Sequence, residues 1–230
     1  MNGATTSMRH FSDTGDQDIR NSLRAFVLQE HTAVSDALLL EEFSLYGGEI
    51  RADLAVLNGC SHAYEIKSGR DTLKRLPHQI KAYSDIFERA TLVTTPCHMA
   101  SARSIVPRWW GLIRATRRRD GICLIRVRHS RWNPSLDARA IASLLWRAEA
   151  LHLLNELGLD SGLRSRNMME LIARLSVAVP VERLADLVRQ AIRARGDWQA
   201  AARRKRCDDT YQPHANLWGC RRILRGSRHR

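Results

Sequence analysis

The spacing of apolar residues changes along the chain and predicts where helices and strands lie. Residues 16–31 place apolar side chains at helical intervals, with acidic residues near the amino end, where the helix dipole favours them. The apolar positions are Ile19, Leu23, Phe26 and Val27, and the acids are Asp16 and Asp18. This pattern predicts a first helix. Residues 1–15 are polar and have no period, so we expect a disordered lead there.

From residue 50 the period changes to two, which is typical of strands. The segments "IRADLAVL" and "HAYEIKS" flank Asn58-Gly59, a strong hairpin signal. A two-residue Asn-Gly loop would pair residues whose numbers add up to 117, which sets Asp53 opposite Tyr64. Asp53 can lie opposite Glu65 only if the numbers of paired residues add up to an even value. That register requires a three- or five-residue loop or a bulge. We predict the even register.

The next segments complete a small α/β core over residues 16–132. "DTLKRLPHQIKAYSDIFERA" has a helical period, with Asp71 or Thr72 as its cap, and Pro77 either kinks this helix or starts a new one. "TLVTT" predicts a buried strand, "MASARSIVP" a short helix, and "WGLIRATR" and "CLIRVRHS" two further strands.

After Asn133-Pro134 the composition favours helices, which predicts an all-helical extension over residues 133–200. The pattern predicts one long helix in "SLDARAIASLLWRAEALHLLNELG", closed by Gly158, and two more in "SRNMMELIARLSV" and "VPVERLADLVRQAIRARG". The last two resemble a helix-turn-helix, although "SVAVP" is longer and more apolar than the usual tight turn. We prefer a helical cap on the core, or a surface for a homodimer. Residues 201–230 predict a loosely ordered basic tail.

The net charge of the chain indicates what kind of molecule it binds. The net charge of +13 favours a polyanion, and nucleic acid is the first candidate, DNA before RNA. We find neither a membrane span nor a secretory signal in the sequence, and five scattered cysteines without a C-x-x-C suit reduced thiols, so we expect a cytoplasmic protein. Lysine is rare beside arginine, which suggests that Lys67 serves as a compact ammonium with a tunable pKa.

Asp53 and Glu65-Ile66-Lys67 form the constellation that could carry chemistry. Two carboxylates on adjacent strands can hold Mg²⁺ through oxygen ligands, and the backbone carbonyl of Ile66 could supply another. Lys67 lies two residues from Glu65 and thus on the same face of a strand, where it could orient or deprotonate an attacking water. Such a spacing also occurs by chance, as a solvated charge pair on an amphipathic strand.

This segment resembles the PD-(D/E)xK, or restriction-endonuclease-like, nuclease superfamily. The resemblance implies a mixed sheet flanked by helices and Mg²⁺-dependent hydrolysis of DNA, with Mn²⁺ as a substitute. Gln79 and Tyr83 resemble the Gln-x-x-x-Tyr motif of the RecB-like exonucleases, whose helix lies beside the metal site. Over about residues 18–200 the chain also looks like a small bacterial family of uncharacterised nuclease-like proteins.

Two features depart from the motif or extend it. Ala52 stands where the superfamily often has proline. The superfamily often adds an acid from its first helical region, and Glu42 is our choice by position over Glu41 and Glu30.

Basic residues near this constellation are candidates for contacts with the DNA backbone. They are Arg51, Arg70, Lys74, Arg75 and Lys81, and each is as readily explained as a solvated surface charge. The sequence therefore predicts a Mg²⁺-dependent deoxyribonuclease. The alternative is a catalytically inactive DNA-binding or regulatory protein on a nuclease-like scaffold, with a helix-turn-helix-like C-terminal unit.

Overall fold

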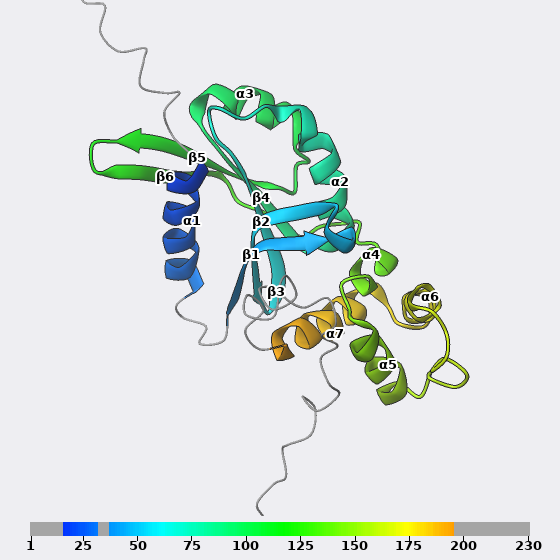
Figure 1. Cartoon of the computed structure of the whole chain (residues 1–230). Coiled ribbons are helices and arrows are strands. Elements are labelled where there is room, and N and C mark those ends of the chain that lie inside the picture. The colour runs from blue at the N-terminus through cyan, green and yellow to red at the C-terminus, as the bar shows by residue number, and fades with distance from the viewer. Residues whose placement is uncertain (1–15, 32–36, 196–230) are drawn as a thin grey trace, which may run out of the picture. The chain divides into compact units, whose positions relative to one another are not determined.

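A single mixed β-sheet organises the computed structural model, which describes residues 16–31 and 37–195 (Figure 1). The strands lie in the order β1-β2-β3-β4-β5-β6. Their bounds are Leu38–Leu45, Ile50–Asn58, Cys60–Lys67, Arg89–Thr94, Gly111–Arg118 and Gly121–Arg128. The predicted lead at 1–15, the end of the predicted extension at 196–200 and the predicted tail at 201–230 lie outside the described residues.

The pairing is parallel in the middle of the sheet and antiparallel on either side. β3 pairs with β4, and β4 with β5, in parallel. β1–β2, β2–β3 and β5–β6 are antiparallel. The predicted fold class, a mixed sheet flanked by helices with a helical C-terminal region, is confirmed.

The β2–β3 hairpin has the even register. Leu54 pairs with Tyr64 and Leu57 with Ser61, so paired positions sum to 118 and not to 117. Gly59 alone separates the paired residues Asn58 and Cys60, with φ of 63°, a left-handed conformation that glycine adopts without strain. This register sets Asp53 across from Glu65.

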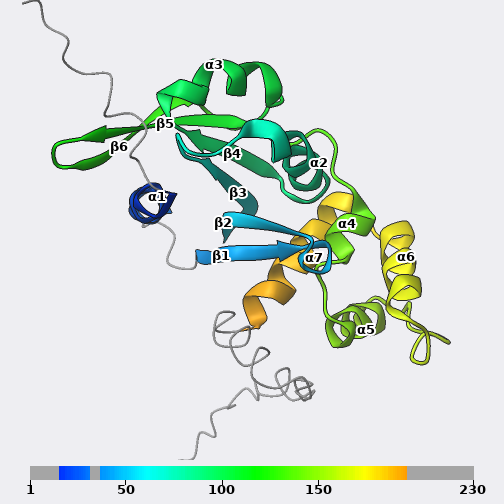
Figure 2. The ribbon, with the colours of Figure 1, turned by 45° about the horizontal axis from the view of Figure 1, so that its top comes forward.

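Helices cover both faces of the sheet (Figures 1 and 2). The first predicted helix is α1, Asp16–His31, and its apolar residues pack on Leu54, Val56, Tyr64 and Ile66. Side chains alternate along β3, so Glu65 and Lys67 point to the opposite face. That face carries α2, Leu76–Ile86, and α3, Pro96–Ile105.

The alternative in which Pro77 starts a new helix is confirmed, whereas the cap predicted at Asp71 or Thr72 does not belong to α2. A short 3₁₀ turn, η2 (Leu73–Arg75), precedes the helix, and Pro77 lies in its first turn, where the missing N–H costs nothing. Asp71 does not cap the helix. Its carboxylate instead accepts hydrogen bonds from the backbone N–H and the hydroxyl of Ser68, at 2.7 and 2.6 Å.

The long helix predicted after residue 133 is two helices, α4 (Ala138–Ala142) and α5 (Arg147–Glu156). Trp146 is extended, with ψ of 157°, and its N–H donates to Glu149 at 2.7 Å, so α5 starts afresh. The spacing of apolar residues stays helical across the gap between α4 and α5. That spacing reflects which residues are buried and does not depend on the backbone angles between the two helices.

The last two described helices, α6 (Met168–Ala178) and α7 (Val181–Ala194), are separated only by Val179-Pro180. The long connection expected from "SVAVP" is therefore wrong, because residues 176–178 continue α6.

α7 is fastened to the core. Arg189 pairs with Glu88 at 2.7 Å, and Arg193 donates to the carbonyl of Leu57 at 3.3 Å. Residues up to Arg193 form one compact unit, and the domain boundary predicted near residue 133 stays a prediction.

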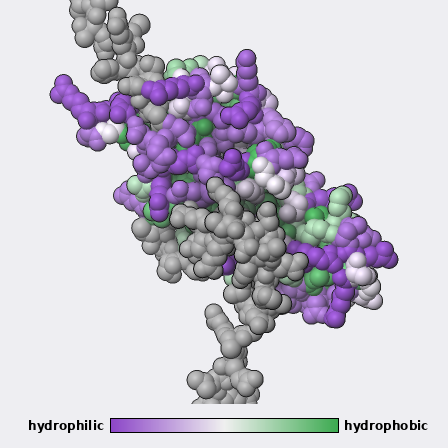
Figure 3. All heavy atoms as spheres, viewed as in Figure 1, coloured by the Kyte–Doolittle hydropathy of each residue, from purple (hydrophilic) through white to green (hydrophobic). Residues whose placement is uncertain are grey.

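Polar residues cover much of the surface around the sheet in the view of Figure 3, and apolar residues appear near α5 and α6. On α6, Met169 and Val177 are 78% and 79% exposed. The predicted homodimer through the C-terminal helices stays a prediction. In the described part of the chain, no helix combines the length and apolar character needed to cross a bilayer.

Candidate functional site

Glu65 lies at the centre of a buried cluster near the end of β3. Its Oε1 accepts from Lys67 Nζ at 2.5 Å and from Gln79 Nε2 at 2.6 Å. Its Oε2 accepts from the Tyr83 hydroxyl at 2.5 Å. The sequence predicted that these four residues share a site, and the structure brings them together. Glu65 is 1% exposed, so its carboxylate faces protein rather than open solvent.

Asp53 comes to the same end of the sheet from β2. The β2–β3 pairing ends at Leu54 and Tyr64, and beyond it the Asp53 Oδ2 accepts the backbone N–H of Ile66 at 2.7 Å. Its Oδ1 accepts from Arg20 Nη2 at 2.9 Å. The predicted contribution of Ile66 was a carbonyl ligand, whereas its N–H is the group that contacts the acid.

Arg20 is the partner that sequence reasoning missed. From α1 it binds both the side chain and the carbonyl oxygen of Asp53, the latter at 2.9 Å. It also pairs with Glu42 at 2.8 Å. The period of α1 shows that Arg20 follows a buried residue, but no local signal links it to a residue 33 positions away.

Glu42, the predicted additional acid, lies in strand β1 and not in a helical region. It has φ of 51° and interrupts the regular pairing, which passes from Glu41 opposite Leu54 to Phe43 opposite Ala52. Its side chain is 49% exposed.

Burial and like charge act together on the two acids of the cluster. Burial, and then the nearby Asp53 carboxylate, raise the pKa of Glu65 to about 7 against the attraction of Lys67. Burial also raises the pKa of Asp53, although the Ile66 N–H and Arg20 oppose the shift. The pKa of Glu65 therefore lies closer to neutral pH than that of an exposed carboxyl group.

The described arrangement does not fit a magnesium ion. All four oxygens of Asp53 and Glu65 accept hydrogen bonds from protein groups, and Lys67 Nζ lies against Glu65 Oε1. No group of three or more His, Cys, Asp or Glu side chains among the described residues could hold a metal. A divalent ion at Glu65 Oε1 would compete with the Lys67 ammonium and the Gln79 amide for that oxygen.

The ring of Tyr83 is supported by Trp110, which sequence reasoning did not assign to the site. The two rings stack with centroids 5.7 Å apart and an interplanar angle of 16°, and Trp110 is fully buried. The stacking fixes the Tyr83 hydroxyl against Glu65.

The residues predicted to contact DNA are all exposed: Arg51, Arg70, Lys74, Arg75 and Lys81. Arg51 and Lys81 each lie close to an acidic side chain. Arg51 lies 3.9 Å from Glu42, and Lys81 bonds Asp85 at 2.8 Å.

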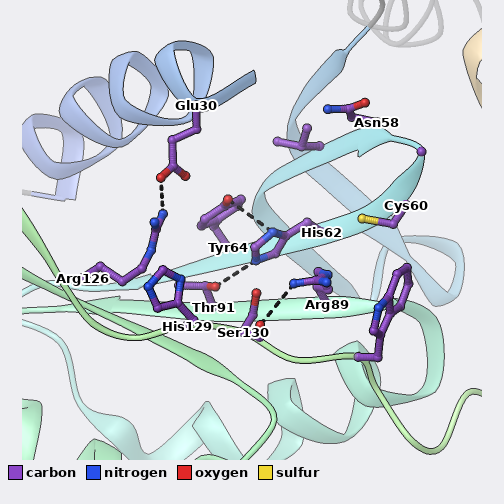
Figure 4. Close-up of a pocket in the computed structure, with 13 residues that line it drawn as sticks. Glu30, Asn58, Cys60, His62, Tyr64, Arg89, Thr91, Arg126, His129 and Ser130 are labelled. Carbon is purple, nitrogen blue, oxygen red and sulfur yellow. Dashed lines mark hydrogen bonds and ion pairs between the residues drawn. The ribbon is translucent and has the colours of Figure 1, made fainter. Parts of the chain in front are cut away.

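A pocket of about 450 Å³ lies near the start of β3, at the other end of the strand from Glu65 (Figure 4). His62 stacks on Tyr64 with ring centroids 4.3 Å apart and bonds the Thr91 hydroxyl at 2.8 Å. Arg126 is bound to Glu30, and Arg89 donates to the carbonyl of Ser130 at 3.1 Å. Both cations of this pocket are therefore engaged by the protein.

Comparison with known proteins gives a family over most of the chain. A family model described as Bacteriophage P4 protein cII matches residues 10–207. Protein cII of Enterobacteria phage P4 is 30% identical over 141 residues, which cover 61% of this chain and 53% of that protein. The chain thus spans about half the length of this relative.

Two solved structures are also similar, at a level that carries no argument about function. The SPO1766 protein of unknown function from Silicibacter pomeroyi is 16% identical, with a TM-score of 0.36 over 70% of this chain and 100% of that one. SfsA of Pyrococcus furiosus, in complex with Ca²⁺, is 11% identical, with a TM-score of 0.31 over 53% of this chain and 65% of that one.

Proposed function

This chain belongs to the Bacteriophage P4 protein cII family, and from that premise we propose that it is a DNA-binding protein with a regulatory rather than a catalytic role. In this proposal the nuclease-like constellation serves the structure of the sheet. Glu65 carries the proposal, because both of its oxygens are held by Lys67, Gln79 and Tyr83. The net charge of +13 supports a polyanionic partner.

The packing around the two acids supports a structural role for them. Asp53 joins α1 to the end of the β2–β3 hairpin through Arg20 and Ile66. Glu65 joins β3 to α2 through Gln79 and Tyr83. Together they tie a helix to each face of the sheet, which is a sufficient reason for both acids in a protein without nuclease activity.

The test separates binding from cleavage. We expect the purified chain to bind labelled DNA in EDTA, with an affinity that falls steeply as salt is raised. We expect linear, circular and single-stranded DNA, and RNA, to stay intact when Mg²⁺ or Mn²⁺ is added. Failure to bind DNA at low salt would end the proposal.

A second candidate, a metal-dependent nuclease, is favoured by one observation. Five residues of the superfamily motif, separated by up to thirty positions, lie at one end of the sheet: Asp53, Glu65, Lys67, Gln79 and Tyr83. Divalent-dependent cleavage by the wild type that disappears in both Asp53→Ala and Lys67→Ala would replace the first proposal with this one. Those variants also guard against a contaminating nuclease, which would cleave equally in all three preparations.

A further inference from the structure

The segment from residue 89 to residue 136 holds an unusual concentration of positive charge. It contains ten arginines and a single acidic residue, Asp120. None of these arginines was among the DNA contacts predicted from the sequence. The segment includes β4, α3, β5 and β6, and its charge therefore belongs to one side of the sheet.

Part of this segment extends beyond the rest of the sheet as a two-stranded ribbon (Figures 1 and 2). β4 pairs with β5 only from Gly111 to Arg114. Beyond that point β5 pairs with β6 alone, up to Arg118 opposite Gly121. We call residues 114–125 the arginine ribbon.

The two faces of the arginine ribbon differ in how their charges are balanced. On the face toward α1, Ala115 and Leu124 join the core, and Arg117 pairs with Asp18 at 2.8 Å. The opposite face carries Arg114 and Arg118, and Arg119 follows in the turn. These three arginines are exposed, and within the described residues none of them makes an ion pair.

The register connects this unbalanced face with the candidate site. Lys67 on β3 lies beside Thr94 on β4, which lies beside Arg114 on β5. Neighbours in register point to the same face, and two strand spacings separate Lys67 from Arg114 by about 10 Å. Arg114 therefore lies on the same face of the sheet as the candidate site.

The dimensions of the ribbon match duplex DNA. The major groove, about 12 Å wide, admits a two-stranded β-ribbon. Arg114 and Arg118 are four residues apart on one strand, about 14 Å, which is the axial rise of about four base pairs. Guanidinium groups bind phosphate oxygens through paired hydrogen bonds.

We infer that the arginine ribbon is the main contact surface for duplex DNA, with Arg114, Arg118 and Arg119 on the phosphates. The inference rests on the proposed function, since it requires that the chain bind DNA. It differs from a helix-turn-helix contact through α7. The exposed Arg183 of that helix pairs with Asp186, and α7 uses its buried face to pack on the core.

The test compares two triple variants of the full chain with equal loss of charge. The ribbon variant carries Arg114→Gln, Arg118→Gln and Arg119→Gln. The control carries Arg164→Gln, Arg174→Gln and Arg183→Gln, all exposed arginines of the helical region. Binding to a fluorescent duplex is measured by anisotropy over a series of KCl concentrations, and circular dichroism checks that each variant is folded.

We expect the ribbon variant to bind at least about tenfold more weakly and the slope of log affinity against log salt to fall by about 2 to 3, for three lost phosphate contacts. The control should stay close to wild type. Arg→Lys at the same three ribbon positions should recover most of the binding, because charge is retained.

Three results would overturn the inference. Equal losses in the ribbon variant and the control would mean that overall charge, and not this surface, determines binding. Tighter binding to single strands than to duplex would exclude the groove contact. Wild-type chain that binds no DNA would refute the proposed function as well, whereas the first two results leave it standing.

Discussion

Burial disfavours the charged form of Glu65. The pKa of its carboxyl rises from an ordinary 4.5 to about 7. Below pH 4.5 the group is protonated in both the folded and the unfolded chain. Between pH 4.5 and 7 the folded chain keeps a proton that the unfolded chain releases, so the free energy of unfolding falls as pH rises through this window.

We predict that Glu65→Gln flattens this part of the stability profile. The wild type should lose up to about 3 kcal/mol between pH 4.5 and 7.5 through this one group, and the variant should lose less because its amide does not ionise. Urea denaturation in EDTA at several pH values measures both profiles. Identical slopes for the two proteins would contradict the assigned burial of Glu65. Asp53, whose pKa is raised in the same direction, remains in both proteins.

A second prediction concerns Gly111, at the start of β5. A Cβ atom built there would lie 2.4 Å from the Thr91 hydroxyl and 3.1 Å from the backbone N of Ser130. We expect Gly111→Ala to reduce the free energy of unfolding by about 1 to 3 kcal/mol through overpacking. Thermal and urea unfolding measure the change.

The Thr91→Ala background provides the control for Gly111. Removal of the Thr91 hydroxyl relieves the closest contact, so Gly111→Ala should cost clearly less there than in the wild type. Additive costs would show that the clash with Thr91 is not the cause.

At the residue scale, strand pairing and helical spacing predict which side chains of the site meet, and amino-acid composition does not. The even register follows from the requirement that Asp53 meet Glu65, and the spacing of Gln79 and Tyr83 follows from the helical period of α2. Arg20 could not be predicted, because its contact with Asp53 depends on where α1 lies across the sheet. The partners of Asp53 and Glu65 matter for function, since they decide whether the acids are open to a cation.

At the scale of elements, the break between α4 and α5 depends on a local backbone hydrogen bond. Glu149 is buried and accepts the N–H of Trp146. α6 has a similar arrangement in solvent, where Glu170 accepts the N–H of Asn167 at 3.0 Å. Helical periods and capping residues predict that helices exist, but they could not show that residues 143–146 leave the helix.

We predict that Glu149→Ala costs more stability than Glu170→Ala. The first change removes a buried carboxylate and leaves a partly buried N–H without its acceptor, so it should cost about 1 to 3 kcal/mol. The second leaves an N–H that water can reach and should cost about 0.5 to 1 kcal/mol. Chemical denaturation of both variants gives the comparison, and equal costs would argue against the burial of the Trp146–Glu149 bond.

At the scale of the whole described unit, α7 is bound to the sheet by charge as well as by apolar packing. Glu88 accepts from Arg189 and also from the backbone N–H of Ser61 at 2.6 Å. One carboxylate therefore joins α7, the β2–β3 hairpin and the start of β4. No sequence pattern predicts this junction, because Arg189 and Glu88 are 101 residues apart.

We predict that Arg189→Ala lowers the free energy of unfolding by about 2 to 4 kcal/mol, because it leaves the largely buried Glu88 carboxylate without its cation. The exposed Arg183 is the matched control, and its replacement by alanine should change stability by less than about 0.5 kcal/mol. Urea denaturation followed by tryptophan fluorescence and by circular dichroism measures both. A negligible effect of Arg189→Ala would mean that α7 is held by its apolar face alone.

The two outermost strands, β1 and β6, each have a single neighbour in the described sheet. Such strands offer unsatisfied backbone groups on which another molecule of the same chain could add and begin aggregation. β6 carries Arg126 and Arg128, and Glu42 within β1 has a left-handed φ of 51°. Charged side chains along one border and a left-handed residue in the other therefore work against the addition of a further strand at either edge of the sheet.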